Sequence, residues 1–359
     1  MRVGLLIYGS LQTISGGYLY DRKLVEHLRC KGDKVWVISL PWRSYAQHLG
    51  DNLSLSLLRR LERLPLDILL QDELNHPSLF LLNRWLRART GYLIISIVHH
   101  LRSSEARSSW QNRLYRWVEH HYLLTVDGFV FNSHTTCSVV EKLVGQDRPA
   151  VVAYPATSLR PDITEDEIAA RVMQPGPLRI IFLGNVIPRK GLHTLLGALE
   201  QLPRDEWALT VVGSLSVDKS YVRAIHRQVA RSGLTKQVLF LGPVSDIDLN
   251  IRLRESHLLV VPSSYEGFGI VYLEGMGFGL PAIASNAGAA GEIITPGRNG
   301  FLVEPRHTSA LAQYLHQLGQ DRERLLAMSL NARRRYLSHP TWDATAERIR
   351  MFLQTIVGK

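Results

Sequence analysis

Short apolar runs alternate with longer, helix-like segments through the first part of the chain. The runs are rich in Val, Ile and Leu, and they occupy residues 2–8, 34–40, 66–71, 92–98 and 128–133. A helical pattern extends from Tyr18 to Leu28, between the first two runs. Continuous apolar runs separated by helices are typical of parallel strands that are buried on both faces. The pattern therefore predicts a parallel α/β domain over residues 1–157.

The pattern changes after residue 157 and then repeats. Residues 158–177 are mainly polar and contain the turn-forming sequence QPGP, which predicts a linker with room for one short helix. A second series of apolar runs follows, at residues 178–184, 207–213, 237–242, 256–263, 280–285 and 300–305. Helical patterns accompany them at residues 191–202, 219–232, 246–255, 270–279 and 308–318. We therefore expect a second doubly wound, Rossmann-like domain over residues 178–340, and a ligand cleft where the carboxyl ends of the two sheets face each other.

Composition and charge narrow the class of protein. The chain has 359 residues, of which 45% are hydrophobic, as expected of a folded protein with two domains. The net charge of +10 favours anionic ligands, but no basic arm or aromatic stacking motif indicates nucleic acid. The two cysteines lack metal-type spacing, the N-terminal apolar run is too short for a secretory signal, and no run is long enough to span a membrane. These features predict a cytoplasmic protein without a metal centre.

Two glutamates flank a glycine-rich turn in the sequence SSYEGFGIVYLEG, which begins at Ser263. A helix is expected to begin near Ile270, and the free amides at its start suit an anion such as phosphate. Glu266 lies in the loop before this helix and Glu274 four residues into it, so both carboxylates can reach the same cleft. Either glutamate taken alone is more often a helix cap or a solvated residue.

Sugar hydroxyls would explain why two acids stand beside a phosphate site. A vicinal diol donates two hydrogen bonds to one carboxylate, and an ionised acceptor forms stronger hydrogen bonds than a neutral one. A ribose on one side of the phosphates and a hexose on the other would each use one glutamate. The pair therefore favours a nucleotide-diphosphate sugar as the ligand.

The order of these motifs resembles that of the retaining, family 4 type of glycosyltransferase, which has the GT-B fold. The resemblance rests on Glu266-x7-Glu274, on GMGFGLPAIASNAGAAGEII and on GRNGFLVEP, and it is strongest over residues 178–305. It implies that Glu266 contacts the donor hexose and Glu274 the nucleotide ribose. It also implies a set of backbone contacts to the donor from the turn, at Gly267, Phe268, Gly269 and Ile270.

The resemblance also implies the reaction and the remaining architecture. The expected reaction moves a sugar from a nucleotide-diphosphate sugar, taken here as a UDP-sugar, to a hydroxyl acceptor with retention of anomeric configuration. No metal and no cofactor other than the donor is expected. The acceptor is left open among a saccharide, a lipid and a small metabolite. A last helix, within residues 341–359, is expected to cross back to the first domain.

A basic residue stands at a second strand–helix junction, in the sequence FLGNVIPRKGLH. Lys190 lies at the expected helix start, where a point charge can meet a diphosphate. The family pattern has an arginine directly after the first glycine, whereas this chain has Asn185 there. Arg189 is a candidate for the missing charge, although it is equally suited to face solvent.

Glycines at two further strand ends complete the predicted donor site. The loop YGSLQTISGGYLY does not have the G-x-G-x-x-G spacing of dinucleotide-binding proteins, so a dehydrogenase is disfavoured. The resemblance implies that the amide of Gly16, and with it Gly17, meets the leaving phosphate. It also implies that the nucleotide base contacts the backbone from Gly242 to Val244.

The acceptor side is predicted from histidines that follow apolar runs. His99 and His100 end the run at 92–98, and the family has a histidine there beside the reacting sugar, which His99 matches better. Imidazole can donate to a sugar hydroxyl or carry a proton. A second loop resembles the family's other acceptor-side loop, and its candidates are Glu73, Asn75 and His76. Capping and turn roles are equally consistent with these three residues.

Two further interpretations stay open at this point. Leu57, Leu58, Leu61 and Leu64 lie on one side of an expected helix that also carries arginines, and such a helix either packs conventionally or lies on the inner face of a membrane. A nucleotide-sugar epimerase or hydrolase, or a module that binds sugar nucleotides without catalysis, would share the same fold. Substitution of the family's arginine by Asn185 is the one feature that favours the non-catalytic module.

Overall fold

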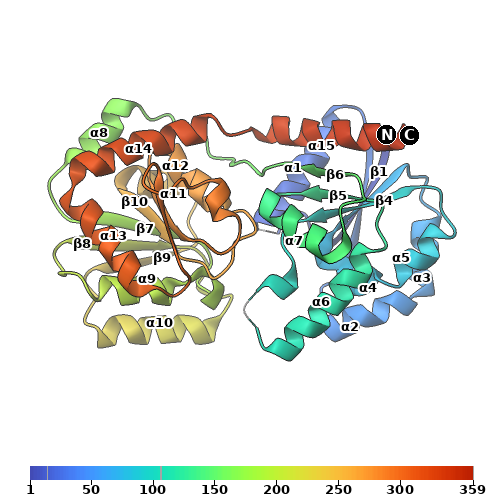
Figure 1. Cartoon of the computed structure of the whole chain (residues 1–359), viewed down its shortest axis with the longest axis horizontal. Coiled ribbons are helices and arrows are strands. Elements are labelled where there is room, and N and C mark those ends of the chain that lie inside the picture. The colour runs from blue at the N-terminus through green and yellow to red at the C-terminus, as the bar shows by residue number, and fades with distance from the viewer. Residues whose placement is uncertain (14, 106, 359) are drawn as a thin grey trace. The chain divides into compact units, whose positions relative to one another are not determined.

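The computed structural model describes residues 1–13, 15–105 and 107–358. The chain divides into two compact units (Figure 1). The first unit comprises residues 1–156 together with the segment from Pro340 onward, and the second comprises Thr157–His339. Each unit has a six-stranded sheet, and all strand pairs are parallel.

The sheet of the first unit has the order β2-β1-β3-β4-β5-β6. Its strands are β1 (Arg2–Tyr8), β2 (Lys34–Leu40), β3 (Ile68–Asp72), β4 (Leu93–Val98), β5 (Gly128–Phe131) and β6 (Ala150–Val152). The first five were predicted from the apolar runs, and β6 was missed because three residues are too short to form a run. The strand order reverses between β1 and β3, so the loops after these two strands flank a topological switch point.

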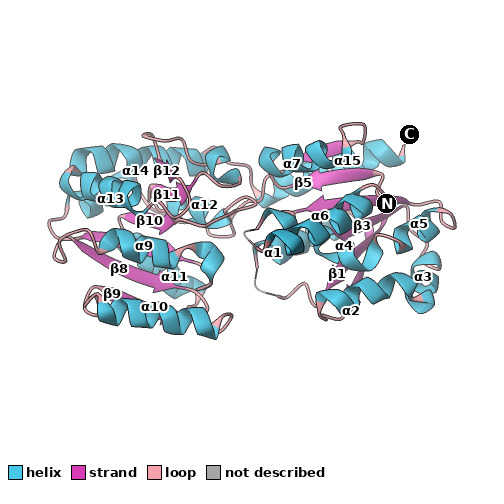
Figure 2. Cartoon of the chain, turned by 60° about the horizontal axis from the view of Figure 1, so that its bottom comes forward, coloured by secondary structure: helices cyan, strands magenta, loops and turns pink. Residues whose placement is uncertain are grey.

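Helices cover both faces of this sheet (Figure 2). They are α1 (Gly16–Cys30), α2 (Tyr45–Gly50), α3 (Leu55–Glu62), α4 (His76–Leu79), α5 (Leu82–Arg87), α6 (Ser109–Leu123), α7 (His134–Val144) and α15 (Trp342–Val357). One apolar cluster joins the sheet to α1 and α15. The other joins the opposite face to α3, α4, α5, α6 and α7. Burial on both faces explains why the strands are continuously apolar rather than alternating.

The last helix, α15, completes the first unit. Its Trp342 ring lies edge-on to Tyr20 of α1, with the ring centroids 5.8 Å apart. Arg350 Nε donates to Asp33 Oδ2 at 2.8 Å, and His27 Nε2 lies 2.8 Å from Glu347 Oε2. The helix therefore packs on α1 and covers part of one face of the first sheet.

The sheet of the second unit has the order β12-β11-β10-β7-β8-β9. Its strands are β7 (Leu178–Leu183), β8 (Trp207–Val212), β9 (Val238–Gly242), β10 (Leu258–Val261), β11 (Ala282–Ser285) and β12 (Gly300–Val303), all of which were predicted. Its helices are α8 (Glu165–Met173), α9 (Leu192–Leu199), α10 (Lys219–Arg231), α11 (Asp246–Glu255), α12 (Ile270–Gly277), α13 (Thr308–Gln320) and α14 (Arg322–Leu337). The strand order reverses between β7 and β10, which makes their carboxyl ends the switch point of this unit.

The segment 158–177, predicted to be a linker, packs as part of the second unit. Thr164 and Glu167 form a reciprocal capping box at the start of α8. Arg171 of α8 donates from Nη1 to Phe278 O at 2.9 Å and from Nη2 to Gly279 O at 3.2 Å. Burial, together with the charges of Arg179 and Arg254, lowers the pKa of this guanidinium to about 10. The polar segment thus contains one short capped helix, and its role as a linker between the two domains stays a prediction.

The leucine stripe of α3 packs into the core of the first unit. Leu57, Leu58 and Leu61 are buried, and Leu64 is half-buried against the same cluster. The conventional packing interpretation is therefore confirmed for this stripe, and its use as a membrane-facing surface was wrong. Within the described residues, no helix is both long and apolar enough to cross a membrane.

Candidate functional site

Lys190 and Glu266 lie at the switch point of the second unit. Lys190 follows β7 in a short 3₁₀ turn, Pro188–Lys190, and Glu266 follows β10. Because β7 and β10 are neighbours in the sheet, their loops meet. Lys190 Nζ donates to Glu266 Oε1, and Ser263 Oγ donates to the same oxygen at 2.7 Å. The sequence prediction that these loops share one site is consistent with this contact.

The carboxylate of Glu266 is held ionised although it is buried. Burial alone would raise its pKa, but the charges of Lys190 and Arg189 and the hydrogen bonds from Lys190 and Ser263 lower the pKa to about 2. A buried charge is tolerated when it is paired and hydrogen-bonded in this way. The site therefore has a fixed negative group with two cations beside it.

Arg189 lies beside Glu266 rather than in solvent. Its Nη1 donates to the carbonyl oxygen of Tyr265 at 2.9 Å and stands 3.6 Å from Glu266 Oε1. Asn185, which occupies the position of the family's arginine, is exposed. A basic pair is thus present at the end of β7, formed by Arg189 and Lys190 within one short turn.

Glycines allow the close packing of these loops. Gly191 directly follows Lys190 and has φ +74°, a left-handed conformation that favours glycine. A Cβ on Gly191 would approach the Pro262 carbonyl oxygen to 2.2 Å. The turn that carries Lys190 can therefore pack against the end of β10 only without a side chain at this position.

Helix α12 begins beside the same loop. Its N-cap, Gly269, has φ +95°, and no side chain caps the helix, so the first amides of α12 lack an intrahelical partner. A Cβ on Gly269 would lie 2.4 Å from the Tyr272 ring. Phe268 is buried, whereas Gly267 and Ile270 are half-buried. The turn therefore offers backbone amides, as predicted for an anion site.

Glu274 lies on the first turns of α12 and is half-buried. Among the described residues it has no hydrogen bond and no ion-pair partner. Burial and the charge of Asp246 raise its pKa to about 7, although the charge of Lys190 opposes the change. Glu274 is thus an acceptor without a donor, in contrast to Glu266.

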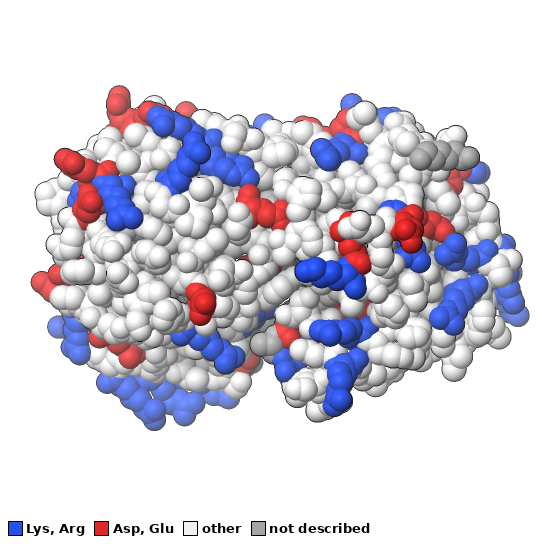
Figure 3. Space-filling view, in the orientation of Figure 1, with Lys and Arg blue, Asp and Glu red and all other residues white. Residues whose placement is uncertain are grey.

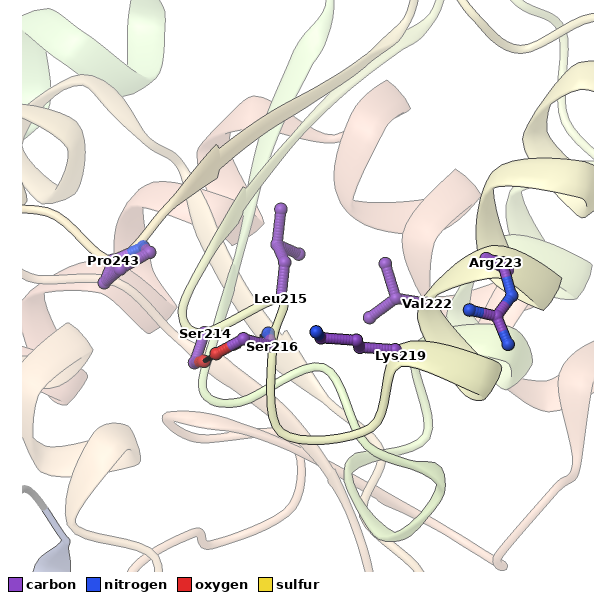
Figure 4. A pocket seen from close by; sticks show the side chains of 7 residues that line it. All are labelled: Ser214, Leu215, Ser216, Lys219, Val222, Arg223 and Pro243. Carbon is purple, nitrogen blue, oxygen red and sulfur yellow. Dashed lines mark hydrogen bonds between the residues drawn. The ribbon is translucent and has the colours of Figure 1, made fainter.

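A pocket of about 450 Å³ lies at the carboxyl ends of β8 and β9 (Figure 4). Lys219 extends from the start of α10 toward Ser216, and Pro243 lies across the pocket, beside the predicted base-contacting residues Gly242 and Val244. The lining residues are Ser214, Leu215, Ser216, Lys219, Val222, Arg223 and Pro243. Since β8 pairs with β7, the pocket belongs to the same edge of the sheet as Lys190.

The first unit brings Gly17 and His99 together. Gly16 starts α1 and is exposed, while a Cβ on Gly17 would lie 3.2 Å from His99 Cδ2. His99 Nε2 stands 3.5 Å from Oδ1 of Asp21, which is fully buried. Burial disfavours the imidazolium, but the nearby carboxylates of Asp21 and Asp72 raise the pKa of His99. The described residues therefore contain a histidine whose protonated form is stabilised next to the glycine turn.

The other acceptor-side candidates lie in the interior of the first unit. Glu73, Asn75 and His76 are 2%, 0% and 1% exposed, so they do not face solvent as an acceptor loop would. His76 Nδ1 stands 3.0 Å from Glu73 Oε1, and burial lowers the pKa of His76 to about 4. Burial also raises the pKa values of Glu73 and Glu119 to about 7. Capping and turn roles, which the sequence left as an equal alternative, therefore fit Glu73, Asn75 and His76 better than contacts to an acceptor.

His100 is partly exposed and lies apart from that buried group. Its Nε2 stands 3.1 Å from Glu105 Oε1. Two groups of described residues have acid and histidine ligand atoms within 4.8 Å of one another, namely Asp21 with Asp72 and His99, and Glu73 with His76 and Glu119. These are the sets with the composition of a metal site, and neither was predicted to be one.

Sequence reasoning missed Ser263, Asp21 and Asp72. Ser263 stands in the stretch that was singled out, and its spacing of three from Glu266 is a common one for side-chain contact in a turn. Asp21 lies on the buried face of α1, three residues after Tyr18 and three before Leu24, so an acid at an apolar position of the helix was a readable signal. Asp72 ends a fully buried strand, where its contact with His99 depends on the sheet order.

Comparisons with known proteins agree with this architecture. Residues 164–335, most of the second unit, match the sequence profile of the family described as Glycosyl transferases group 1. The GDP-mannose-dependent alpha-(1-6)-phosphatidylinositol monomannoside mannosyltransferase of Mycobacterium tuberculosis is 29% identical over 184 residues, which are 49% of this chain and 47% of the relative. This chain spans about half the length of the curated relatives that it matches.

Solved structures resemble the chain over its whole length. The sucrose-phosphate synthase of Thermosynechococcus elongatus has a TM-score of 0.83 at 20% identity, with 100% of each chain covered. Anabaena Alr3699/HepE in complex with UDP and glucose has a TM-score of 0.75 at 20% identity, with 99% of this chain and 100% of the other covered. The chain therefore has the GT-B fold, and residues 164–335 resemble the family of group 1 glycosyl transferases. The finer assignment to family 4 stays a prediction.

We expect Gly191→Ala to destabilise the second unit more than Gly297→Ala does. Both glycines have nearly the same φ, +74° and +75°, but a Cβ on Gly297 would meet nothing within 4 Å. Left-handed backbone alone costs about 1–2 kcal/mol for a non-glycine residue. At Gly191 the clash with Pro262 adds to that cost, so native-state hydrogen exchange of β7 and β10 amides should accelerate further. Equal losses of stability in the two variants would contradict the close approach of Gly191 to the Pro262 carbonyl oxygen.

We expect Glu274→Gln to stabilise the ligand-free protein at pH 8 but not at pH 4. The pKa of Glu274 is 4.5 ordinarily and about 7 when folded. Ionisation of Glu274 therefore lowers the free energy of unfolding progressively as pH rises from 4.5 to 7, and the loss is constant above pH 7. Scanning calorimetry at both pH values should show a higher Tm only at pH 8. The exposed Glu304→Gln is the control, and a pH-independent Tm difference would argue against the unpaired carboxylate.

Proposed function

We propose that the chain is a glycosyltransferase that moves a sugar from a nucleotide-diphosphate sugar to a hydroxyl acceptor. The observation that carries the proposal is the constellation at the switch point of the second unit. Lys190 and Arg189 bring positive charge to the ends of β7 and β10, and the uncapped start of α12 brings free amides. Helix N-termini and cations together suit a diphosphate. The group 1 profile over the same segment supports this proposal.

The two glutamates are assigned to the two sugars of the donor. Glu274 accepts no hydrogen bond from any residue that the structure describes, so the ribose diol would supply the missing donors. Glu266 is already ionised by Lys190, Arg189 and Ser263, and its remaining acceptor capacity is assigned to the donor hexose. The amides of Gly267 to Ile270 are assigned to the phosphates.

Charge stabilisation of the leaving diphosphate is the proposed source of catalysis. Negative charge develops on the phosphate as the glycosidic bond breaks, and Lys190 is already fixed beside it by Glu266. Preorganised groups of this kind are usually the largest catalytic contribution. We assign the amide of Gly16, with Gly17, to the same phosphate, and His99 to the reacting sugar, as the resemblance implies.

Retention of configuration and independence from metal are part of the proposal. A leaving-phosphate oxygen on the same face of the sugar would take the acceptor proton, which balances the step without a protein nucleophile. Lys190, Arg189 and the start of α12 would replace the charge of a divalent ion. UDP is the proposed nucleotide, supported by the UDP named for the Anabaena structure. GDP is the direct competitor, because the Mycobacterium relative is named for GDP-mannose.

Two competing functions, a nucleotide-sugar epimerase or hydrolase and a non-catalytic binding module, can be distinguished from a transferase. An epimerase or hydrolase would convert the donor without an acceptor. A non-catalytic module was favoured only by Asn185, which stands where the family pattern has an arginine. The charge of Arg189, which lies beside Glu266, replaces the charge of that arginine. The pocket at the ends of β8 and β9 gives the proposed base of the donor a place next to Gly242 and Val244. A cytoplasmic location is part of the same proposal.

We expect Lys190→Ala to lower donor turnover by about 10²–10³, the typical effect of removing one preorganised donor of charge stabilisation. Lys190→Arg should retain part of the activity because it keeps the charge. The exposed Lys236→Ala is the matched control. Release of nucleotide from UDP-sugars and GDP-sugars, with and without acceptor alcohols, measures the effect. Near-normal turnover in Lys190→Ala would remove the lysine from the mechanism.

We expect nucleotide affinity to fall as pH drops below 7. Ribose hydroxyls bind the ionised form of Glu274, whose pKa in the free protein is about 7, so protonation competes with binding. Glu274→Gln should bind more weakly at pH 8 and lose most of the pH dependence. Isothermal titration with UDP and GDP at pH 6 and pH 8 measures both effects. Unchanged affinity in the variant would refute the ribose assignment.

A further inference from the structure

Helix α6 of the first unit is apolar on two opposite sides. Its inward side packs into the core through Tyr115, Val118, Tyr122 and Leu123, which are buried. Its outward side carries a second apolar row, whose members are 62%, 40%, 53% and 38% exposed: Trp110, Leu114, Trp117 and the C-cap residue Leu124. We call these four residues the α6 row. The spacings of four, three and seven place them on one face of the helix.

The α6 row is unusual for a surface that faces only water. Scattered apolar side chains are common on protein surfaces, but a contiguous row with two exposed tryptophans indicates a binding surface. Trp117 is fixed in place, because its ring lies 5.8 Å from Phe80 and 4.2 Å from His121. The row is therefore a formed surface and not a set of independent side chains.

The charges around the α6 row are positive. Arg113 and Arg116 are exposed on α6, and Glu119, the helix's one acid, is buried. Helices α3 and α5 cover the same face of the sheet and add Arg59, Arg60, Arg63 and Arg84, all exposed. None of these six arginines has an ion-pair partner among the described residues. Figure 3 shows basic side chains gathered over this part of the unit.

We propose that the α6 row docks the protein on an anionic lipid bilayer. Tryptophan rings and leucines enter the boundary between headgroups and acyl chains, and arginines stay at the level of anionic headgroups. The arginines favour a bilayer over a partner protein. An apolar groove of a protein would have to desolvate the arginines, whereas lipid phosphates pair with them. The surface is thus assigned to α6, and not to the buried leucines of α3.

The position of α6 connects this surface to the interior of the unit. Tyr115 and Glu119 of its inward side lie next to the group that contains Glu73 and His76, and the Arg102 guanidinium stands 4.9 Å from the Tyr115 ring centroid. A bilayer bound to α6 would lie about one helix diameter, ~10 Å, from the loop after β3. The docking surface does not depend on the proposed function.

Co-sedimentation of the full chain with vesicles tests the proposal. We expect binding to phosphatidylcholine vesicles that contain a quarter of phosphatidylglycerol, weaker binding to pure phosphatidylcholine, and loss of binding as salt rises above about 0.1 M, where charges become screened. Trp110→Ser with Trp117→Ser should lower the partition coefficient about tenfold or more. Arg113→Gln with Arg116→Gln should lower binding to the anionic vesicles and reduce its salt dependence.

Met351→Ser is the matched control for these variants. Met351 is 60% exposed on α15, which covers the opposite face of the same sheet, so its removal should leave vesicle binding unchanged. Circular dichroism melting curves and UDP and GDP titrations show whether the α6 variants remain folded. Because no donor sugar is present in the sedimentation assay, its outcome is independent of the transfer reaction.

Three results would overturn the proposal. The first is absence of binding by the unmodified chain, and the second is equal binding by the double tryptophan variant and the unmodified chain. The third is a concentration-dependent dimer, seen by light scattering, that the tryptophan substitutions dissociate while vesicles are not bound. That result would assign the α6 row to contact between two copies of this chain.

Discussion

A buried carboxylate shared between two loops organises the second unit's candidate site. Glu266 lies where the strand order reverses, and its ionisation depends on Lys190 and Arg189, which come from the neighbouring strand's loop. Removing any one of the three would leave an unpaired buried charge or a displaced cation, which is costly in a low-dielectric surrounding. The same contact also sets where positive charge is available beside α12. Structure and proposed chemistry therefore depend on one ion cluster.

The two units have the same kind of sheet topology, but the loops at their switch points lie in different electrostatic environments. In each, the loops that matter follow the strands on either side of a reversal in strand order. In the second unit the carboxylate of Glu266 is held charged by cations, whereas the carboxylate of Glu274 has no hydrogen-bond donor within the described part of the chain. In the first unit, carboxylates outnumber histidines and are pushed toward their neutral forms by burial, as for Glu73 and Glu119, while Asp21 holds His99 toward its charged form. The two switch points thus differ in the charge state of their buried groups although their strand topology is the same.

Strands and helices that form a regular pattern of apolar residues could be predicted from the sequence. Strands β7 to β12 are long apolar runs between turn residues, and every one was predicted. The three-residue β6 was not predicted, since it has too few residues to form a pattern. Helix α8 lies in polar sequence, so one short helix was expected in that segment but without bounds. The Thr164–Glu167 capping box was readable and would have identified α8. Arg189 beside Glu266, Asp21 beside His99 and the exposure of Trp110 and Trp117 depend on contacts between distant segments, which periodicity does not encode.

The return of α15 to the first unit constrains the order in which the protein can mature on the ribosome. Trp342, Glu347 and Arg350 supply contacts to α1 and to the turn at Asp33, so one face of the first sheet stays uncovered until they have been synthesised. The whole second unit emerges before them. A nascent chain therefore carries an incomplete first unit with apolar side chains of α1 exposed, while the second unit already has all its strands. Because residues 342–357 follow the second unit in the chain, the first unit cannot complete its packing until the second unit has been synthesised.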